Sequence, residues 1–562
     1  MTTTAPAPGP GDAAVADPAA EAVSGAEDPG SLNFAGALMA LSKAGLRGRR
    51  AARAGLGLGA ETAKILAGFS SVAPAKGDAR FADPTWDDNP AYRRLKQVYL
   101  AWANTVTGVV DGAEVDWRTK ERARFAATIL TTAVSPTNTL PGNPAALKRA
   151  LETGGKSLLT GAKHFAGDLV HNGGMPSIVD ASGFVVGENT AVTPGAVVYR
   201  DEVCEVLQFK PQTAKIRSRP VLMVPPQINK YYFMDLAPGR SFVEHAVSRG
   251  IPFFLISWRN PRKENGSWDL DTYGRAVLDA IDVATEISGS DDVNLLGLCA
   301  GGILTATVLS HLAAEGSTKV KSVSFGVTLL DWDVPAPIGA FQSKGLLGVA
   351  RRKSRSAGVL DARSLGSVFT WMRPNDLVWN YWVNNYLMGK KPPAFDILAW
   401  NDDKTNLPGA LHGQFLDIFS GNLLVTGGIT VLGNPVDLSA IKCDSYVTGG
   451  LSDHLTPWDG CYRATQLLGG HSTFVLSPTG HIQTQVSPPG NPKSHFFTGP
   501  EPGPDPHAWR AAAERQSGTW WDHWADWVID RSGAEKAAPA KLGSRAHPVL
   551  GPAPGTYVLQ PA

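Results

Sequence analysis

The clearest hydrophobic pattern of this chain is an alternation of short apolar runs with longer amphipathic stretches between residues 219 and 330. Residues 221–224 and 293–296 form short apolar runs, which are typical of strands buried on both faces of a sheet. Residues 302–314 carry apolar side chains at helical spacing. The alternation therefore predicts a mainly parallel sheet whose strands are connected by helices.

The N-terminal part of the chain has a different pattern. Residues 1–30 are rich in alanine, proline and glycine with scattered acidic residues, a composition typical of disordered segments. The pattern is helical and basic from Leu32 to about Val72, and long helical patterns dominate from Asn89 to His171. We therefore predict a disordered tail over residues 1–30 and a mostly helical N-terminal domain over residues 31–210.

Residues 211–562 are predicted to form a second domain of the α/β class, which is interrupted once. From residue 331 to about residue 438 the alternation breaks, and the sequence becomes aromatic and irregular. Insertions at this position of such a sheet often form caps, so we interpret residues 331–438 as a cap insertion. The alternation then resumes at Cys443, and residues 445–448 and 472–476 predict two more strands.

The candidate chemistry lies in residues 297–301, with the sequence GLCAG, between the predicted strand at 293–296 and the predicted helix at 302–314. This arrangement is typical of a nucleophile elbow, in which a sharp turn raises the nucleophile above the sheet and glycines allow the turn. It predicts an α/β-hydrolase fold with Cys299 as the nucleophile. A thiolate attacks and leaves a thioester readily, so it suits acyl transfer as well as hydrolysis. The alternative is that Cys299 is an ordinary buried cysteine.

A cysteine nucleophile of this kind needs a histidine base and a carboxylate that orients the histidine. In this architecture both follow the nucleophile in the chain, each after a later strand. Asp453 follows the predicted strand at 445–448, and His481 follows the one at 472–476. We assign His481 as the base and Asp453 as the orienting acid, with a loop histidine and a turn aspartate as the alternatives. His454 is either a second functional histidine or a structural one.

An oxyanion hole beside Cys299 is expected to use the backbone N–H of Ala300 and a second N–H from the loop after an earlier strand. That strand is the apolar run at 221–224, and the loop after it spans residues 225–230. Ile228 in this loop is the candidate for the second donor.

Composition narrows the class of function. The formal net charge is +1, so no global attraction to nucleic acid is expected. Four cysteines without a signal peptide indicate a reducing compartment, and Cys204, Cys443 and Cys461 are interpreted as packing residues. Residues 295–314 lack charged side chains, but the elbow inside them favours a buried strand and helix over a transmembrane segment. We expect no metal and no cofactor.

Further stretches of the sequence carry a resemblance to a known family. They are DPTW at 83–86, PPQINK at 225–230, SWRNP at 257–261, GLCAGG at 297–302, DHLTPW at 453–458, GHI at 480–482 and PAPGTYV at 552–558. In this order and spacing they make the chain similar to the polyhydroxyalkanoate synthases, or poly(3-hydroxyalkanoate) polymerases, from about Phe81 onward. The chain matches the single-subunit type, and Gln227 and residues 483–494 are closer to its medium-chain branch.

The resemblance implies an acyltransferase that polymerises (R)-3-hydroxyacyl-CoA into polyhydroxyalkanoate polyester, with release of CoA and covalent acyl-cysteine intermediates. It implies a Cys-His-Asp triad, which it places at Cys299, His481 and Asp453. It also implies a homodimer in the cytoplasm that works at polyhydroxyalkanoate granules, with the growing polyester chain and the granule surface as partners. Neither nucleic acid nor a transmembrane segment is part of this interpretation.

Two other functions stay open at this point. A cysteine-dependent acyl-CoA thioesterase or ester hydrolase would use the same three residues, because only the acceptor of the acyl group differs. The matching region from about Phe81 to Lys210 favours the polymerase, since simple hydrolases lack it. The third hypothesis is a non-catalytic granule-surface protein that keeps the fold, and the intact order of cysteine, aspartate and histidine argues against it.

Overall fold

The computed structural model describes residues 49–341 and 344–562, and the chain falls into two compact units. The first comprises the described residues up to Pro176 together with Gly339–Val349 and Ser367–Lys390. The second comprises Ser177–Ile338, Ala350–Gly366 and Lys391–Ala562. The tail predicted over residues 1–30 lies outside the described residues, and the domain limits taken from the sequence stay predictions.

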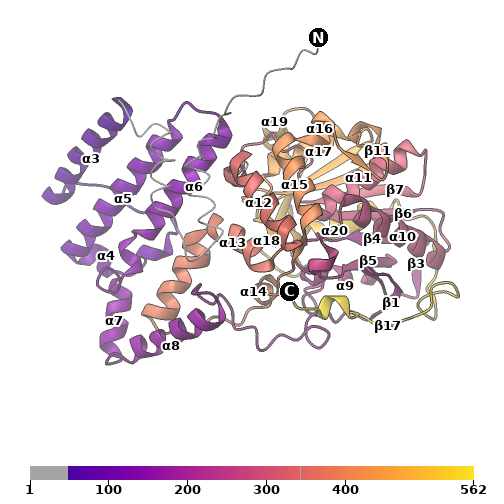
Figure 1. The fold of residues 1–562 in the computed structure, drawn as a ribbon, viewed down its shortest axis with the longest axis horizontal. Helices are drawn as coiled ribbons and strands as arrows, with labels where there is room; N and C mark the ends of the chain where they lie inside the picture. Colours follow the sequence, from indigo (N-terminus) through magenta and orange to yellow (C-terminus); the bar gives the residue numbers. More distant parts are fainter. Residues whose placement is uncertain (1–48, 342–343) are drawn as a thin grey trace, which may run out of the picture. The chain divides into compact units, whose positions relative to one another are not determined.

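The first unit is built from helices, and Figure 1 shows those before residue 176 from indigo to purple. Those before residue 176 are α3 (Arg49–Ala67), α4 (Thr85–Asp88), α5 (Pro90–Asp111), α6 (Trp117–Ala133), α7 (Pro144–Glu152) and α8 (Lys156–His171), with the 3-10 turns η2 (Ala79–Phe81) and η3 (Pro136–Asn138). The later segments add the π-helical turns η7 (Asn375–Trp379) and η8 (Trp382–Leu387). The mostly helical N-terminal region predicted from the sequence is confirmed.

Helix α5 illustrates how the sequence forms these helices. The side chain of Asn89 accepts hydrogen bonds from two backbone N–H groups of the first turn, and Pro90 begins the helix, where its missing N–H costs nothing. Further along the helix, Tyr99 packs with Phe81 and Trp86 in a small buried cluster. The helix therefore begins at a capping signal and is held by its apolar face.

The two later segments bring part of the predicted insertion into the first unit. Trp371 packs with Phe125 and Ile129 of α6 in a buried cluster. The hydroxyl of Tyr386 donates a hydrogen bond to Asp168 of α8 at 2.7 Å. The insertion therefore contributes residues to both units.

The second unit is built around one eleven-stranded sheet. From one edge to the other its strands are β15 (Glu514–Ser517), β14 (His495–Thr498), β13 (Ser472–Ser477), β12 (Asp444–Gly450), β7 (Val320–Gly326), β6 (Val293–Leu298), β4 (Val221–Val224), β5 (Phe253–Trp258), β2 (Cys204–Phe209), β1 (Gly195–Arg200) and β17 (Gly551–Pro552). The strands from β13 to β5 are parallel, and those toward both edges are antiparallel to their neighbours. The carboxyl ends of the parallel strands therefore meet at one edge, where sites form in open α/β sheets.

Helices cover both faces of this sheet. One face carries α10 (Leu270–Ser288), α11 (Ala300–Ala314), α17 (Trp458–Leu467) and α19 (Pro506–Ala512), and the other carries α9 (Phe242–Ser248) and α20 (Trp520–Ile529). Along β4, Leu222 belongs to the first core and Met223 to the second, as the alternation of a strand requires. The predicted α/β-hydrolase fold is confirmed. Of the helices in the described ranges, none combines enough length and apolar character to cross a membrane.

Between β7 and β12 the described residues, 327–341 and 344–443, add no strand to the large sheet. The helices of this insertion are α12 (Lys344–Ala357), α13 (Ala362–Met372), α14 (Asp396–Asp402), α15 (Gly409–Gly421) and α16 (Leu423–Thr426). Its short strands pair with each other, β8 (Val359–Leu360) with β9 (Leu407–Pro408) and β10 (Thr430–Val431) with β11 (Asn434–Pro435). The break in the alternation predicted near residue 331 is therefore an insertion into the fold.

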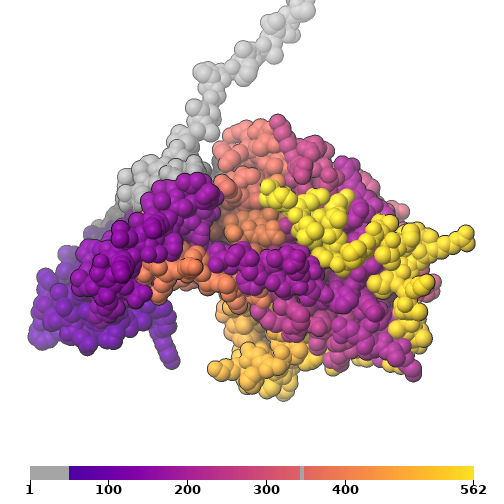
Figure 2. Space-filling model, turned by 90° about the horizontal axis from the view of Figure 1, so that it is seen from below, coloured from indigo at the N-terminus to yellow at the C-terminus, as the bar shows by residue number. Residues whose placement is uncertain are grey.

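The C-terminal segment, which we call the strap (residues 535–562), lies on the outside of the second unit and is yellow in Figure 2. Its strands β16 (Glu535–Ala537) and β17 pair with β3 (Lys215–Arg217) and β1. Glu205 of β2 is fully buried and accepts hydrogen bonds from the backbone N–H groups of Thr556 and Tyr557, at 2.9 and 3.0 Å. Arg200 pairs with the same carboxylate at 2.6 Å. A buried carboxylate thus fastens the strap to the edge of the sheet.

Candidate active site

Cys299 lies at the sharp turn between β6 and α11. Its backbone φ of 50° and ψ of −120° are rare for a residue with a side chain, so the surrounding structure must hold the turn. The Cys299 N–H donates to the carbonyl of Gly326 at 2.9 Å, and the Cys299 carbonyl accepts from the N–H of Gly302 at 2.9 Å. The thiol-bearing residue is half-buried. The elbow expected from the sequence is therefore present at the carboxyl end of β6.

Glycine is needed at position 301 because the end of a neighbouring strand approaches it closely. A Cβ on Gly301 would lie 2.3 Å from the carbonyl oxygen of Val224 and 2.5 Å from that of Pro225. Both are backbone atoms, so no side-chain rotation could relieve the clash. This close approach brings the loop after β4 against the elbow.

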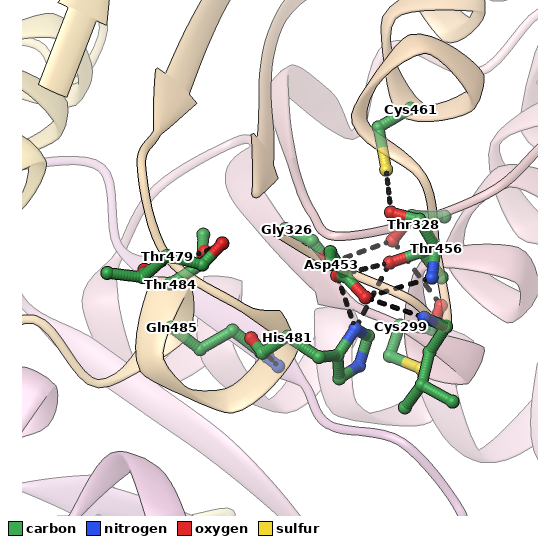
Figure 3. A network of polar contacts seen from close by, with 11 residues as sticks. Cys299, Gly326, Thr328, Asp453, Thr456, Cys461, Thr479, His481, Thr484 and Gln485 are labelled. Atoms are coloured by element: carbon green, nitrogen blue, oxygen red, sulfur yellow. Dashed lines mark hydrogen bonds and ion pairs between the residues drawn. The ribbon is translucent and has the colours of Figure 1, made fainter. Parts of the chain in front are cut away.

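Asp453 and His481 come from the segments that follow β12 and β13. Nδ1 of His481 lies 2.7 Å from Oδ2 of Asp453, and both side chains are buried. His481 is the first residue of the short helix α18 (His481–Gln485). Two adjacent parallel strands thus deliver the carboxylate and the imidazole to one place, as Figure 3 shows.

The Asp453 carboxylate accepts four hydrogen bonds. The backbone N–H groups of Leu455 and Thr456 donate to Oδ1 at 2.8 and 3.0 Å, while the Thr456 hydroxyl and His481 Nδ1 each lie 2.7 Å from Oδ2. Burial by itself raises the pKa of Asp453, but the charge of His481 and these hydrogen bonds outweigh it and hold the pKa below its ordinary value. Asp453 is therefore a buried carboxylate at neutral pH.

His481 is shifted in the opposite direction. Burial lowers its pKa, but the negative charge of Asp453 and the interaction with Cys299 outweigh burial and raise the pKa to about 10. A hydrogen bond between His481 and Cys299 contributes to this shift. Because Nδ1 faces Asp453, Nε2 is the nitrogen that remains for the sulfur. The structure thus brings together the three residues that the sequence singled out (Figure 3).

The two candidate oxyanion donors lie in segments that meet at the elbow. Ala300 is the first residue of α11, so its N–H is at the positive end of the helix dipole. Ile228 is half-buried in the loop after β4. The next residue, Asn229, has a positive φ of 68° and donates its N–H to the hydroxyl of Thr405 at 2.8 Å. The donor roles of Ala300 and Ile228 stay predictions.

The insertion also holds the far end of the loop that contains Ile228. Trp400 of α14 donates its indole N–H to the carbonyl of Lys230 at 2.7 Å, and the Lys230 ammonium pairs with Asp403 at 2.6 Å. The hydroxyl of Tyr232 donates to the same carboxylate at 2.9 Å. The position of this loop beside the elbow therefore depends on the insertion.

Thr456 is the residue of this network that the sequence analysis missed. Its hydroxyl lies 2.7 Å from Oδ2 of Asp453 and 3.1 Å from Nδ1 of His481. A threonine three residues after an aspartate is common in ordinary turns, so the pattern gave no signal of its own. Only the folded arrangement reveals that Thr456 contacts both groups.

His454 directly follows Asp453 and is half-buried, and its role stays a prediction. Of the other cysteines, Cys204 and Cys461 are buried and Cys443 is half-buried. Burial raises the pKa of all three thiols, which disfavours the reactive thiolate. Across the described ranges, no three histidine, cysteine, aspartate or glutamate side chains converge on a position for a metal ion.

Two family models match the chain. The model described as the N-terminus of poly-beta-hydroxybutyrate polymerase (PhaC) matches residues 77–246. The model described as the alpha/beta hydrolase fold matches residues 226–484, which include the elbow and the Asp453–His481 pair.

Curated relatives share most of the chain. Poly(3-hydroxyalkanoate) polymerase 1 of Ectopseudomonas oleovorans is 46% identical over 501 residues, which cover 89% of this chain and 89% of that protein. The poly(3-hydroxyalkanoate) polymerase subunit of Cupriavidus necator is 41% identical over 86% of this chain and 83% of that protein. Among solved structures, a monoacylglycerol lipase of Paleococcus ferrophilus is 14% identical with a TM-score of 0.32, over 57% of this chain and 98% of that one.

Proposed function

The chain belongs to the family of poly(3-hydroxyalkanoate) polymerases, which are acyltransferases, and we propose that Cys299, His481 and Asp453 form its catalytic triad. The proposed reaction joins (R)-3-hydroxyacyl units from their CoA thioesters into polyhydroxyalkanoate and releases CoA. One observation carries this proposal. A buried carboxylate 2.7 Å from Nδ1 of the imidazole leaves Nε2 to the half-buried thiol at the elbow.

In the first step, Nε2 of His481 takes the proton of the Cys299 thiol, and the sulfur attacks the thioester carbonyl of the substrate. The imidazolium is stabilised by the Asp453 carboxylate, which explains why its pKa is raised to about 10. As the carbonyl re-forms, the bond to the CoA sulfur breaks, and the imidazolium returns a proton to that sulfur. A 3-hydroxyacyl group is left on Cys299.

In the second step, the acyl group passes to a hydroxyl. The 3-hydroxyl of the bound unit or of an incoming unit loses its proton to His481, and its oxygen attacks an acyl thioester carbonyl. A carbon–oxygen ester bond forms, a carbon–sulfur bond breaks, and the imidazolium gives the proton to the released sulfur, so each cycle lengthens the polyester by one unit. The same imidazole serves both proton transfers.

The tetrahedral oxyanion of each step needs two N–H donors. We propose the N–H of Ala300, at the start of α11, and that of Ile228, in the loop that packs against Gly301. Water in the site would end each chain by hydrolysis, so a cover over the elbow is expected. The contact between Thr405 of the insertion and Asn229 supports such a role for the insertion.

The proposals for the substrate, the assembly and the location are based on the family. We propose a preference for medium-chain (R)-3-hydroxyacyl-CoA, on the basis of Gln227 and residues 483–494. We further propose that the enzyme works as a homodimer at the surface of polyhydroxyalkanoate granules in the cytoplasm, where it holds the growing polyester chain.

The experiment measures CoA release from short-chain and medium-chain (R)-3-hydroxyacyl-CoA together with the size of the product. It compares the wild type with Cys299→Ala and with the matched control Cys443→Ala, whose thiol precedes β12 at the end of the sheet remote from the elbow. We expect high-mass polyester from the wild type and the control. The Cys299→Ala variant should release CoA at least about 1,000-fold more slowly, because the covalent step is lost.

Other results would contradict the proposal in different ways. Thiol release that yields only free hydroxy acid would identify a cysteine-dependent thioesterase. Release that is unchanged in Cys299→Ala would remove the cysteine from the chemistry. No release from either substrate by a folded wild type would favour a granule-surface protein without catalysis.

A further inference from the structure

We infer that Thr456 is a positioning residue of the active site, whose hydroxyl holds the Asp453 carboxylate and the His481 imidazole in one geometry. The inference rests on the proposed function, because it presupposes that these two groups serve Cys299. Neither the elbow motif nor the order of nucleophile, acid and base assigns a role to this threonine.

The geometry around the hydroxyl points to a bridge. Oγ1 of Thr456 lies 2.7 Å from Oδ2 of Asp453 and 3.1 Å from Nδ1 of His481. The hydroxyl has one proton, and the ionised carboxylate can only accept, so the hydroxyl donates to Asp453. Its lone pairs are then free to face the Nδ1–H of His481, which also donates to Oδ2 at 2.7 Å. Three groups thus share a closed set of hydrogen bonds.

The hydroxyl is itself held in place. The Thr456 N–H donates to Oδ1 of Asp453 at 3.0 Å, so the same residue contacts both oxygens of the carboxylate. On the other side, the thiol of Cys461 lies 3.5 Å from the Thr456 carbonyl. Thr456 is 5% exposed, and a β-branched side chain has few rotamers. The bridge is therefore rigid.

The bridge stabilises the charged groups, which matters because the Asp453 carboxylate is buried. Without the hydroxyl, Oδ2 of Asp453 would keep His481 as its side-chain donor, and the ionised form would lose one charge-assisted hydrogen bond. The imidazolium would lose an acceptor at Nδ1 at the same time. The loss at Nδ1 disfavours the charged imidazolium more than the neutral imidazole, so the pKa of His481 falls and the neutral base that takes the proton of Cys299 forms at a lower pH.

The test compares Thr456→Val, which removes the hydroxyl at nearly constant shape, with Thr456→Ser, which keeps it. Two quantities are measured against pH. One is kcat/KM for CoA release, and the other is the rate at which iodoacetamide alkylates Cys299, identified by mass spectrometry of the labelled peptide. In Thr456→Val we expect the acidic limb of both profiles to move down by about one pH unit, since a hydrogen bond to a charge is worth roughly that much. Thr456→Ser should restore the wild-type profile.

A merely structural role would lower the amount of folded protein without moving either profile. Unmoved profiles in folded Thr456→Val would therefore overturn the inference. If this variant does not fold, the same two measurements on Thr456→Ala decide the question. The proposed function fails separately: it is contradicted when Cys299→Ala keeps its CoA release, whatever the threonine variants do.

Discussion

The two sides of the proposed active site are held by different forces. On the nucleophile side, the conformation and packing of the backbone hold the turn: Cys299 has a positive φ, and Gly301 packs against the carbonyl of Val224. On the acid–base side, Asp453 and His481 are held by hydrogen bonds between polar groups. We therefore expect a substitution near Cys299 to act through the fold, whereas one near His481 should act through charge and protonation.

The largest effect is expected from Asp453→Asn, which tests the acid–base side. The amide keeps the shape of the side chain but favours the wrong tautomer of His481, so kcat should fall by about 1,000- to 10,000-fold. The change in the free energy of unfolding should be too small to explain this loss of activity. The measurement is steady-state CoA release together with urea denaturation, and Asp459→Asn in the first turn of α17 is the control. A loss of activity that merely follows unfolding would show that Asp453 acts through the fold rather than through the protonation of His481.

The next effect is expected from Gly301→Ala, which tests the nucleophile side. The new methyl group would lie 2.3 Å from the carbonyl oxygen of Val224, so the strand end or the elbow must move. We expect the free energy of unfolding to fall by about 3 kcal/mol, as for an overpacked core. Urea denaturation measures this change. A variant with wild-type stability and intact labelling of Cys299 would show that the elbow is not held by backbone packing.

The third prediction concerns pH and tests the acid–base side. The pKa of His481 is raised to about 10, above the ordinary 6.5, so its pairing stabilises the fold fully below pH 6.5 and is lost as pH rises through about 10. The lowered pKa of Asp453 acts in the other direction, and its contribution is lost as pH falls below 3.8.

This pH dependence is measured as the difference in unfolding free energy between the wild type and His481→Gln. The difference should be largest at or below about pH 6.5, should shrink as pH rises from there toward about 10, and should be small above about pH 10, where the imidazole is no longer charged in the wild type. A difference that stays constant from neutral to alkaline pH would show that the pairing of His481 with Asp453 contributes nothing through charge.

The smallest effect is expected from Gly108→Ala, which removes a glycine in the other unit. A Cβ at this position of α5 meets no atom within 4 Å, in contrast to Gly301. Alanine favours helix over glycine, so the first unit should gain up to about 1 kcal/mol in stability. Thermal unfolding measures the gain. A loss of stability at Gly108 as large as that at Gly301 would mean that close packing is not what sets the elbow glycine apart.

Much of the second unit could be predicted because its signals are local. The apolar run at 293–296 lies within β6, and the glycines around Cys299 mark the turn to α11. The helix begins at Ala300 rather than at the predicted Gly302, because the turn at the elbow passes directly into the first helical turn. Asp453 and His481 could be singled out in the same way, because each follows a strand that the local pattern predicts. The structure brings both to Cys299.

The rest could not be predicted because it depends on contacts between distant residues. No local pattern indicates that Trp371, in the insertion, packs with Phe125 of the helical unit. Nor does the sequence indicate that Thr405 receives the N–H of Asn229. The sequence analysis missed Thr456 for another reason, because its neighbours in sequence are ordinary for a turn. Its importance lies in the two groups that its hydroxyl contacts.

The strap has a consequence for the way the second unit is made. Glu205 and Thr556 are 351 positions apart, yet the strap supplies the N–H groups that satisfy this buried carboxylate. During vectorial synthesis, β1 and β2 leave the ribosome long before β17, the outer neighbour of β1, has been made. Because such non-local closure is slow, the nascent sheet keeps an unpaired edge, and Glu205 lacks its N–H donors from the strap, until nearly the whole unit has been translated. The strand that closes this edge of the second unit, β17, is only two residues long and comes from the far end of the chain.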